Sequence, residues 1–159
     1  MTCRLQTIES VDRAICQIDL LKNFYCGTYV STEMNNAIIK PNHFIVILVL
    51  NKNQSIGHYI VAHRINFNEL NIFCSLGINP KQYKLQQLFK INTVHEYWYS
   101  NVKLQSDQSN CCAYFCLFFL YKIFVNGLSF KHFLNLFEHQ SLVENESIVH
   151  NFVKTHFLM

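Results

Sequence analysis

One uninterrupted apolar stretch restricts the fold more than any other feature of the sequence. Residues 111–125, CCAYFCLFFLYKIFV, contain a single charged side chain, that of Lys122. A helix that is apolar on every side has to be surrounded by protein or by lipid. A membrane span needs about 20 apolar residues, so this segment is too short and Lys122 interrupts it. We therefore predict a buried core helix that packs across a sheet, and no contact with a membrane.

Four segments predict the strands of that sheet. Residues 43–50, HFIVILVL, form a continuous β-branched run, which is typical of a strand buried on both faces. Further strands are predicted at 57–65, 69–76 and 93–100, and residues 51–57 form a polar turn between the first two. A meander of strands followed by helices indicates an α+β arrangement.

The remaining segments are predicted to be helical. Residues 8–23 carry apolar side chains at helical spacing, and Gly27 ends this pattern. Ser31 is the expected N-cap of a short helical turn that runs to Met34. Later helices are predicted at residues 81–90, 111–125, 129–138 and 143–155. Without a linker or a repeat, the 159 residues predict a single domain, 1–159.

Composition and charge exclude some classes of protein. Half of the residues are hydrophobic and 14% are charged, so the chain is not expected to be disordered. The net charge of +3 comes from scattered Lys and Arg, which permits contact with nucleic acid without arguing for it. The seven cysteines include no CxxC pair, so no metal site is predicted. No apolar leader opens the sequence, and we expect reduced thiols in an intracellular protein that is not secreted.

Three residues are candidates for cysteine chemistry. Cys111 stands where the polar loop SDQSN enters the apolar helix, and a helix N-terminus lowers the pKa of a thiol. His58 opens a predicted strand, which would hold an imidazole rigidly enough to act as a base. Gln105 can donate an amide hydrogen bond to an oxyanion, with the backbone N–H of Cys111 as the second donor. For each of them the alternative is structural: a core cysteine like Cys112 and Cys116, a strand histidine, or a loop glutamine.

The segment LQSDQSNCCAYFCLFFL resembles the active-site segment of the adenovirus protease (adenain-like) family. Relatives include the SUMO-specific proteases and the proteases of Polinton (Maverick) elements and adintoviruses. IGHYIVA, NIFCSLGINP, YWYSNVKLQS and FYCGTYVSTEMNNAIIKPNHFIVI resemble other parts of these enzymes, so the likeness covers about residues 20–137. It implies a papain-like cysteine protease fold, with a central mixed sheet flanked by helices. It also implies a cysteine endopeptidase of viral or virus-like transposon origin, active in the host nucleus, the host cytoplasm or the virion.

The resemblance assigns roles to individual residues. Cys111 would be the nucleophile and His58 the base, while Gln105 and the backbone N–H of Cys111 would form the oxyanion hole. Tyr59 and Trp98 would lie beside the substrate channel. The substrates would be capsid or virion precursor proteins, and the protein would act as a monomer. The chemistry would need no cofactor, although DNA or an activating peptide would be an accessory by the same resemblance.

Two positions depart from the family pattern. Cys74 stands where the family has an Asp or Glu bonded to the histidine, and a neutral thiol is a poor acceptor. Strand alternation would put Asn71 on the face opposite Cys74, and Glu69 would need a bulge to replace the acid. Cys112 stands where the family has Gly after the nucleophile, but the spacing from Gln105 favours its neighbour Cys111. Two hypotheses remain: a working peptidase, or a pseudoprotease that serves as a binding module.

Overall fold

A five-stranded mixed sheet forms the centre of the protein. The computed structural model describes residues 3–50 and 57–158, so the turn predicted at 51–57 lies outside the described residues except for Gly57. The strands follow one another in sheet order as β1 (Tyr25–Val30), β2 (Phe44–Leu50), β3 (Gly57–Arg64), β4 (Glu69–Phe73) and β5 (Glu96–Tyr99). Strands β2, β3 and β4 form an antiparallel meander as predicted. The fourth predicted strand, β5, instead joins β4 in parallel, and β1 joins the other side of the sheet in parallel. The α+β prediction with a mixed sheet is confirmed.

The edge strand β1 was not predicted from the sequence. Gly27 was interpreted as the end of a helix, but it lies inside β1 with a φ of 123°. Only glycine adopts that backbone region without strain. The ladder between β1 and β2 is irregular between Tyr25 and Thr28, where Gly27 stands. An irregular parallel edge strand has no clear alternation of apolar and polar residues, so its pattern was hidden.

The described residues form six α-helices and three other helical turns. The α-helices are α1 (Ile8–Cys16), α2 (Asp19–Phe24), α3 (Gln86–Ile91), α4 (Cys112–Leu120), α5 (Phe130–Asn135) and α6 (Leu142–His156). The turns are the 3-10 helices η1 (Ser31–Asn36) and η2 (Pro80–Tyr83) and the π-helical η3 (Tyr121–Val125). The helix predicted at 8–23 is split because Ile18 is extended. The helix predicted at 81–90 is split because Lys84 adopts a left-handed conformation.

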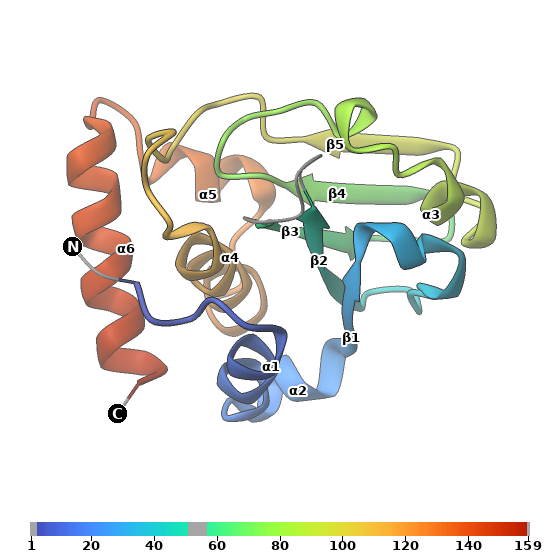
Figure 1. Cartoon of the computed structure of the whole chain (residues 1–159), viewed down its shortest axis with the longest axis horizontal. Helices are drawn as coiled ribbons and strands as arrows, with labels where there is room; N and C mark the ends of the chain where they lie inside the picture. The colour runs from blue at the N-terminus through green and yellow to red at the C-terminus, as the bar shows by residue number, and fades with distance from the viewer. Residues whose placement is uncertain (1–2, 51–56, 159) are drawn as a thin grey trace.

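The apolar helix α4 lies on one face of the sheet, as predicted, with all nine of its residues buried. Helix α6 packs on α4 from the side away from the sheet (Figure 1). The opposite face of the sheet has a second core, to which β2 contributes Ile45 and Ile47. The prediction that β2 is buried on both faces is therefore confirmed. No helix among residues 3–50 and 57–158 is long and apolar enough to cross a membrane.

Candidate active site

Two cysteines of α4 hold the helix against β3 at a single residue. The backbone N–H of Tyr59 donates to Sγ of Cys112 at 3.4 Å, and Sγ of Cys116 donates to the carbonyl of Tyr59 at 3.3 Å. Cys112 and Cys116 are one helical turn apart, so both contact the same stretch of strand. Because His58 directly precedes Tyr59, this pair of contacts packs α4 against the strand that carries the histidine.

Cys112 is the first residue of α4, and backbone N–H groups surround its sulfur. Hydrogen bonds from the N–H groups of Tyr59, Ala113 and Cys112 itself lower the pKa of the Cys112 thiol. Burial has the larger effect, and the resulting pKa is raised. At rest the site therefore holds a thiol. The same N–H groups stabilise any negative charge that forms on the sulfur during a reaction.

The predicted nucleophile, Cys111, lies at the N-cap of α4 and forms a disulfide with Cys3. This corrects the expectation that all seven cysteines are reduced, and in this structure Cys111 has no free thiol. The disulfide ties the N-terminal segment to the start of α4. In the same segment the N–H of Arg4 donates to the hydroxyl of Tyr114 at 3.1 Å. The role of Cys111 as the nucleophile stays a prediction that applies to the reduced protein.

His58 contacts the cysteine that replaces the family's acid. Its Nε2 lies 3.3 Å from Sγ of Cys74, and the same sulfur lies 3.3 Å from the hydroxyl of Tyr83. Cys74 is fully buried at the end of β4. Neither Asn71 nor Glu69 makes a hydrogen bond to His58 in the described part of the chain. The geometry thus agrees with placing Cys74 in the third position, while the functional role remains a prediction.

Burial lowers the pKa of His58 to about 4. Removing the imidazolium from water is costly, and Cys74 offers no negative charge to offset that cost in its thiol form. The imidazole is therefore neutral at pH 7. A preformed thiolate–imidazolium pair is not expected in the resting protein.

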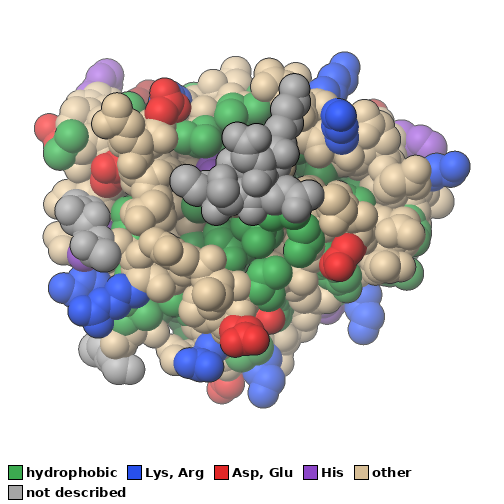
Figure 2. Space-filling view, in the orientation of Figure 1, with side chains coloured by type: hydrophobic (Ala, Val, Ile, Leu, Met, Phe, Trp, Pro, Cys, Tyr) green, Lys and Arg blue, Asp and Glu red, His purple; other side chains and the backbone are tan. Residues whose placement is uncertain are grey.

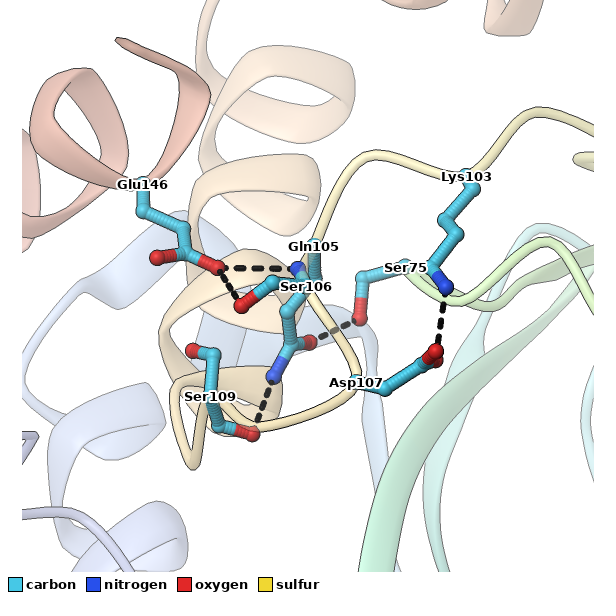
Figure 3. A network of polar contacts seen from close by, with 7 residues as sticks. All are labelled: Ser75, Lys103, Gln105, Ser106, Asp107, Ser109 and Glu146. Carbon is cyan, nitrogen blue, oxygen red and sulfur yellow. Dashed lines mark hydrogen bonds and ion pairs between the residues drawn. The ribbon is translucent and has the colours of Figure 1, made fainter. Parts of the chain in front are cut away.

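Gln105 closes the loop that leads into α4 (Figure 3). Its Oε1 accepts from the hydroxyl of Ser75 at 2.5 Å, and its Nε2 donates to the carbonyl of Ser109 at 2.9 Å. The amide orientation is set by Ser75, and one of its two N–H bonds is used by Ser109. Gln105 is buried, so a role in the oxyanion hole would depend on its other N–H.

The same loop is attached to α6 and carries an ion pair. The backbone N–H and the hydroxyl of Ser106 both donate to Oε1 of Glu146, each at 2.9 Å. Lys103 pairs with Asp107 at 2.7 Å on the surface (Figure 3). These contacts fix the backbone before Cys111 from two sides. They were not predicted from the sequence, because Glu146 lies 40 residues from Ser106.

The two predicted substrate-channel residues lie apart. Tyr59 is 3% exposed, and its hydroxyl donates to the carbonyl of Gln6 at 3.2 Å, so the N-terminal segment covers it. Trp98 is 65% exposed on the edge strand β5. With Phe130 and Leu134 of α5 it lines a cavity of about 500 Å³, whose lining does not include His58. The channel roles of Tyr59 and Trp98 remain predictions.

Tyr83, Ser75 and Cys3 also contact residues of this site, and no sequence pattern predicted them. Tyr83 and Ser75 stand in or beside the segment NIFCSLGINP, where only the acid position was considered. The partner of Cys3 lies 108 residues away, a separation at which no local pattern operates. Within the described residues no group of His, Cys, Asp and Glu side chains could hold a metal ion.

Comparison with known proteins gives the fold but not the sequence family. No family model and no curated protein sequence match the chain. The crystal structure of the ASFV pS273R protease matches with a TM-score of 0.60 over 96% of this chain and 67% of that one, at 15% identity. The fold is that of a SUMO-protease-like cysteine protease. A second crystal structure of the pS273R protease, the Se-Met form, matches 72% of this chain and 43% of that one, at 20% identity and a TM-score of 0.44.

The SUMO-protease-like fold confirms the predicted papain-like architecture of the adenain and SUMO-protease type. The chain spans about two thirds of the length of the matched pS273R protease. The finer assignment to the adenovirus, Polinton or adintovirus type rests on the sequence resemblance alone and stays a prediction.

Proposed function

We propose that the protein is a cysteine peptidase in which Cys112 is the nucleophile and His58 the base. The observation that carries the proposal is the double contact of Cys112 and Cys116 with Tyr59, which packs the start of α4 and its free thiol against the strand that carries His58. This moves the nucleophile one residue along from the position predicted from the sequence, because the sulfur of Cys111 is bonded to Cys3. The SUMO-protease-like fold supports the class of reaction.

The neutral resting state dictates how the reaction would begin. Cys112 transfers its thiol proton to His58 as the sulfur attacks the substrate carbonyl, because neither group is charged beforehand. The N–H groups at the start of α4, with the second amide N–H of Gln105, stabilise the oxyanion. His58 then gives the proton to the leaving amine, and a thioester remains on Cys112. Water, deprotonated by His58, hydrolyses the thioester and restores the thiol.

The burial of the thiol suggests which substrates fit. Cys112 is 8% exposed, and the family that the sequence resembles has narrow channels beside the nucleophile, so we propose a small residue such as glycine before the cleaved bond. Hydrophobic side chains gather near the middle of one face of the molecule (Figure 2), and we propose this apolar surface as a docking area for the substrate. By resemblance we propose capsid or virion precursor proteins as the substrates. By the same resemblance DNA or an activating peptide would act as an accessory.

The proposal is tested with a peptide vinyl sulfone that ends in glycine, with the adduct located by mass spectrometry. The adduct is expected on Cys112 in the parent chain and in Cys111→Ser. It should disappear in Cys112→Ser and fall at least tenfold in rate in His58→Ala. Cys16→Ser, which removes an exposed free cysteine, is the matched control.

The other outcomes of this experiment are equally informative. An adduct on Cys111 after reduction would return the nucleophile to the position predicted from the sequence and overturn the choice of Cys112. A folded protein that labels at neither cysteine, with or without reductant, would overturn the peptidase proposal.

A second candidate is a non-catalytic binding module on the same fold. Two observations favour it: Cys74 replaces the acid, and the pKa of His58 is lowered to about 4. This hypothesis expects Cys112 to react with iodoacetamide at the rate of an ordinary buried thiol, unchanged in His58→Ala. The peptidase proposal expects His58→Ala to slow that reaction, because the base that accepts the thiol proton is lost.

A further inference from the structure

The segment before α1 is attached to the start of the helix that carries Cys112. Residues 3–6, which we call the N-terminal strap, belong to no helix or strand, and α1 begins only at Ile8. In Figure 1 the strap leads past α4 into α1. The disulfide between Cys3 and Cys111 fastens its first residue to the N-cap of α4.

Two hydrogen bonds and one apolar side chain hold the strap in addition to the disulfide. The N–H of Arg4 donates to the hydroxyl of Tyr114 at 3.1 Å, and the carbonyl of Gln6 accepts from the hydroxyl of Tyr59 at 3.2 Å. Leu5 is buried in the core on the α4 face of the sheet. A segment that takes part in no helix or sheet ladder opens locally more easily than the elements around it. The covalent bond therefore decides whether the strap stays in place.

The strap contacts the two neighbours of the Cys112 thiol. Cys111 precedes Cys112 in the chain, and Tyr59 donates its backbone N–H to the sulfur of Cys112 at 3.4 Å. The strap is bonded to the first neighbour and accepts a hydrogen bond from the second. With the strap in place Cys112 is 8% exposed and Tyr59 is 3% exposed. A sulfur that attacks a peptide carbonyl needs an open side on which the substrate backbone can lie, and this state offers little of one.

We propose that the strap is an autoinhibitory segment, which the disulfide between Cys3 and Cys111 holds over the start of α4. Reduction of the disulfide releases the strap and opens Cys112 to substrate. The inference rests on the proposed function in taking Cys112 as the nucleophile. It gives Cys3 and Cys111 a role that the cleavage reaction itself does not need.

The chemical step is a thiol–disulfide exchange with a dithiol as the reductant. One thiolate of the dithiol attacks a sulfur of the bond between Cys3 and Cys111, which breaks that bond and leaves a mixed disulfide. The second thiolate of the dithiol then attacks the mixed disulfide, and the dithiol leaves as a cyclic disulfide. Two electrons pass to the cysteine pair, and the two protons of the dithiol end on Cys3 and Cys111 as thiols.

Burial of the bond makes the release slow. Cys3 is 1% exposed and Cys111 is 3% exposed, so a dithiol reaches the sulfurs only in molecules whose strap fluctuates away from the core. We therefore expect the bond to be reduced more slowly than an exposed disulfide. The closed state would persist through a brief exposure to thiols and be lost on a long one.

The first measurement is the rate at which the peptide vinyl sulfone ending in glycine labels Cys112. The oxidised parent chain is compared with the same chain after treatment with dithiothreitol and its removal without oxygen. We expect Cys112 to react about tenfold faster in the reduced chain, because the rate scales with the fraction of molecules in which the strap is open. Cys3→Ser should react at the faster rate in both states. Cys16→Ser, which removes an exposed free cysteine, is the matched control and should keep the difference seen in the parent chain.

The second measurement follows the strap itself and needs no activity. Amide hydrogen exchange of residues 4–6 should become faster when the parent chain is reduced, and it should be equally fast in Cys3→Ser. The amides of β2 lie at the centre of the fold and should exchange slowly in every case, which shows that the protein is still folded.

The two proposals fail in different ways. Unchanged exchange of residues 4–6 on reduction would overturn the release of the strap, whatever Cys112 does. Faster exchange with equal labelling of Cys112 in both states would overturn the autoinhibition and leave the peptidase proposal standing. Faster exchange in a folded protein whose Cys112 is labelled in neither state would contradict the peptidase proposal, and with it the inhibitory role of the strap.

Discussion

Burial sets the protonation state of two histidines on β3. The pKa values of His58 and His63 are both lowered to about 4, mainly because a charged ring would lose its hydration on burial. The nearby His43 lowers the pKa of His63 further. The sequence indicates a strand histidine at each position, but not how deeply it lies. The local pattern indicates on which face of the sheet a strand side chain lies. How deeply that side chain is buried depends on which other elements pack over it.

These two pKa values predict how stability depends on pH. In the unfolded chain both histidines bind a proton near pH 6.5, whereas in the folded protein they bind it only near pH 4. The free energy of unfolding should therefore be constant above pH 6.5 and fall between pH 6.5 and 4, by up to about 3 kcal/mol for each histidine. Urea unfolding at a series of pH values measures this slope.

Two variants control the pH experiment. His58→Gln combined with His63→Gln should make the slope between pH 6.5 and 4 shallower, whereas the exposed His132→Gln should leave it unchanged. If the double variant keeps the full slope of the parent chain, burial of these two rings is not its cause.

At the scale of elements, the site depends on how two loops fit together. The carbonyl of Ser75 accepts from the N–H groups of Leu104 and Gln105 at 2.8 and 3.1 Å. Gly77, in the same turn, has a φ of 69°, and a Cβ there would lie 2.8 Å from the carbonyl carbon of Val102. The sequence predicted a turn at this glycine, but only the structure shows that the turn packs against the loop that carries Gln105.

Gly77→Ala should therefore lower the free energy of unfolding by about 2–3 kcal/mol, the sum of the left-handed backbone and the backbone clash. It should also slow labelling of Cys112, because Gln105 and the start of α4 move. Gly127→Ala is the matched control, since Gly127 has a φ of 71° but nothing within 4 Å of the added carbon. The control should cost about 1 kcal/mol and leave labelling unchanged. Equal effects of the two variants on labelling would argue against coupling between the loops.

At the scale of the whole molecule, the disulfide joins the two ends of the site. Cys3 and Cys111 are 108 residues apart, and their bond fastens the N-terminal segment beside Tyr59 and the start of α4. Disulfides that persist in reducing compartments are rare and are commonly linked to catalysis or redox sensing. If the protein has the predicted nuclear or cytoplasmic location, the disulfide between Cys3 and Cys111 would be exposed to a reducing environment.

Cys3→Ser should lower the free energy of unfolding by about 2–5 kcal/mol under oxidising conditions, because a loop of this length is no longer closed in the unfolded chain. Chemical denaturation with and without reductant measures the difference, and the parent chain should lose a similar amount when reduced. Cys16→Ser should change little, because Cys16 is exposed and free. Seven titratable thiols in the folded, unreduced protein would contradict the disulfide and this prediction together.

The sequence by itself determined the parts of this protein that follow from local periodicity. The all-apolar run at 111–125 predicted the core helix, and the run at 43–50 predicted the doubly buried strand β2. These succeed because side-chain burial repeats with the period of the helix or strand.

Only the tertiary structure decided which cysteine faces which partner. Cys111 and Cys112 are adjacent and chemically identical, so no sequence pattern separates them with certainty. The packing of α4 on Tyr59 turns Cys112 toward the strand of His58 and leaves Cys111 to Cys3. The row of Tyr83, Cys74 and His58 likewise joins three elements that are distant in sequence. Such contacts depend on how parts of the chain that are distant in sequence pack together. A local pattern of residue types and spacing does not show this packing.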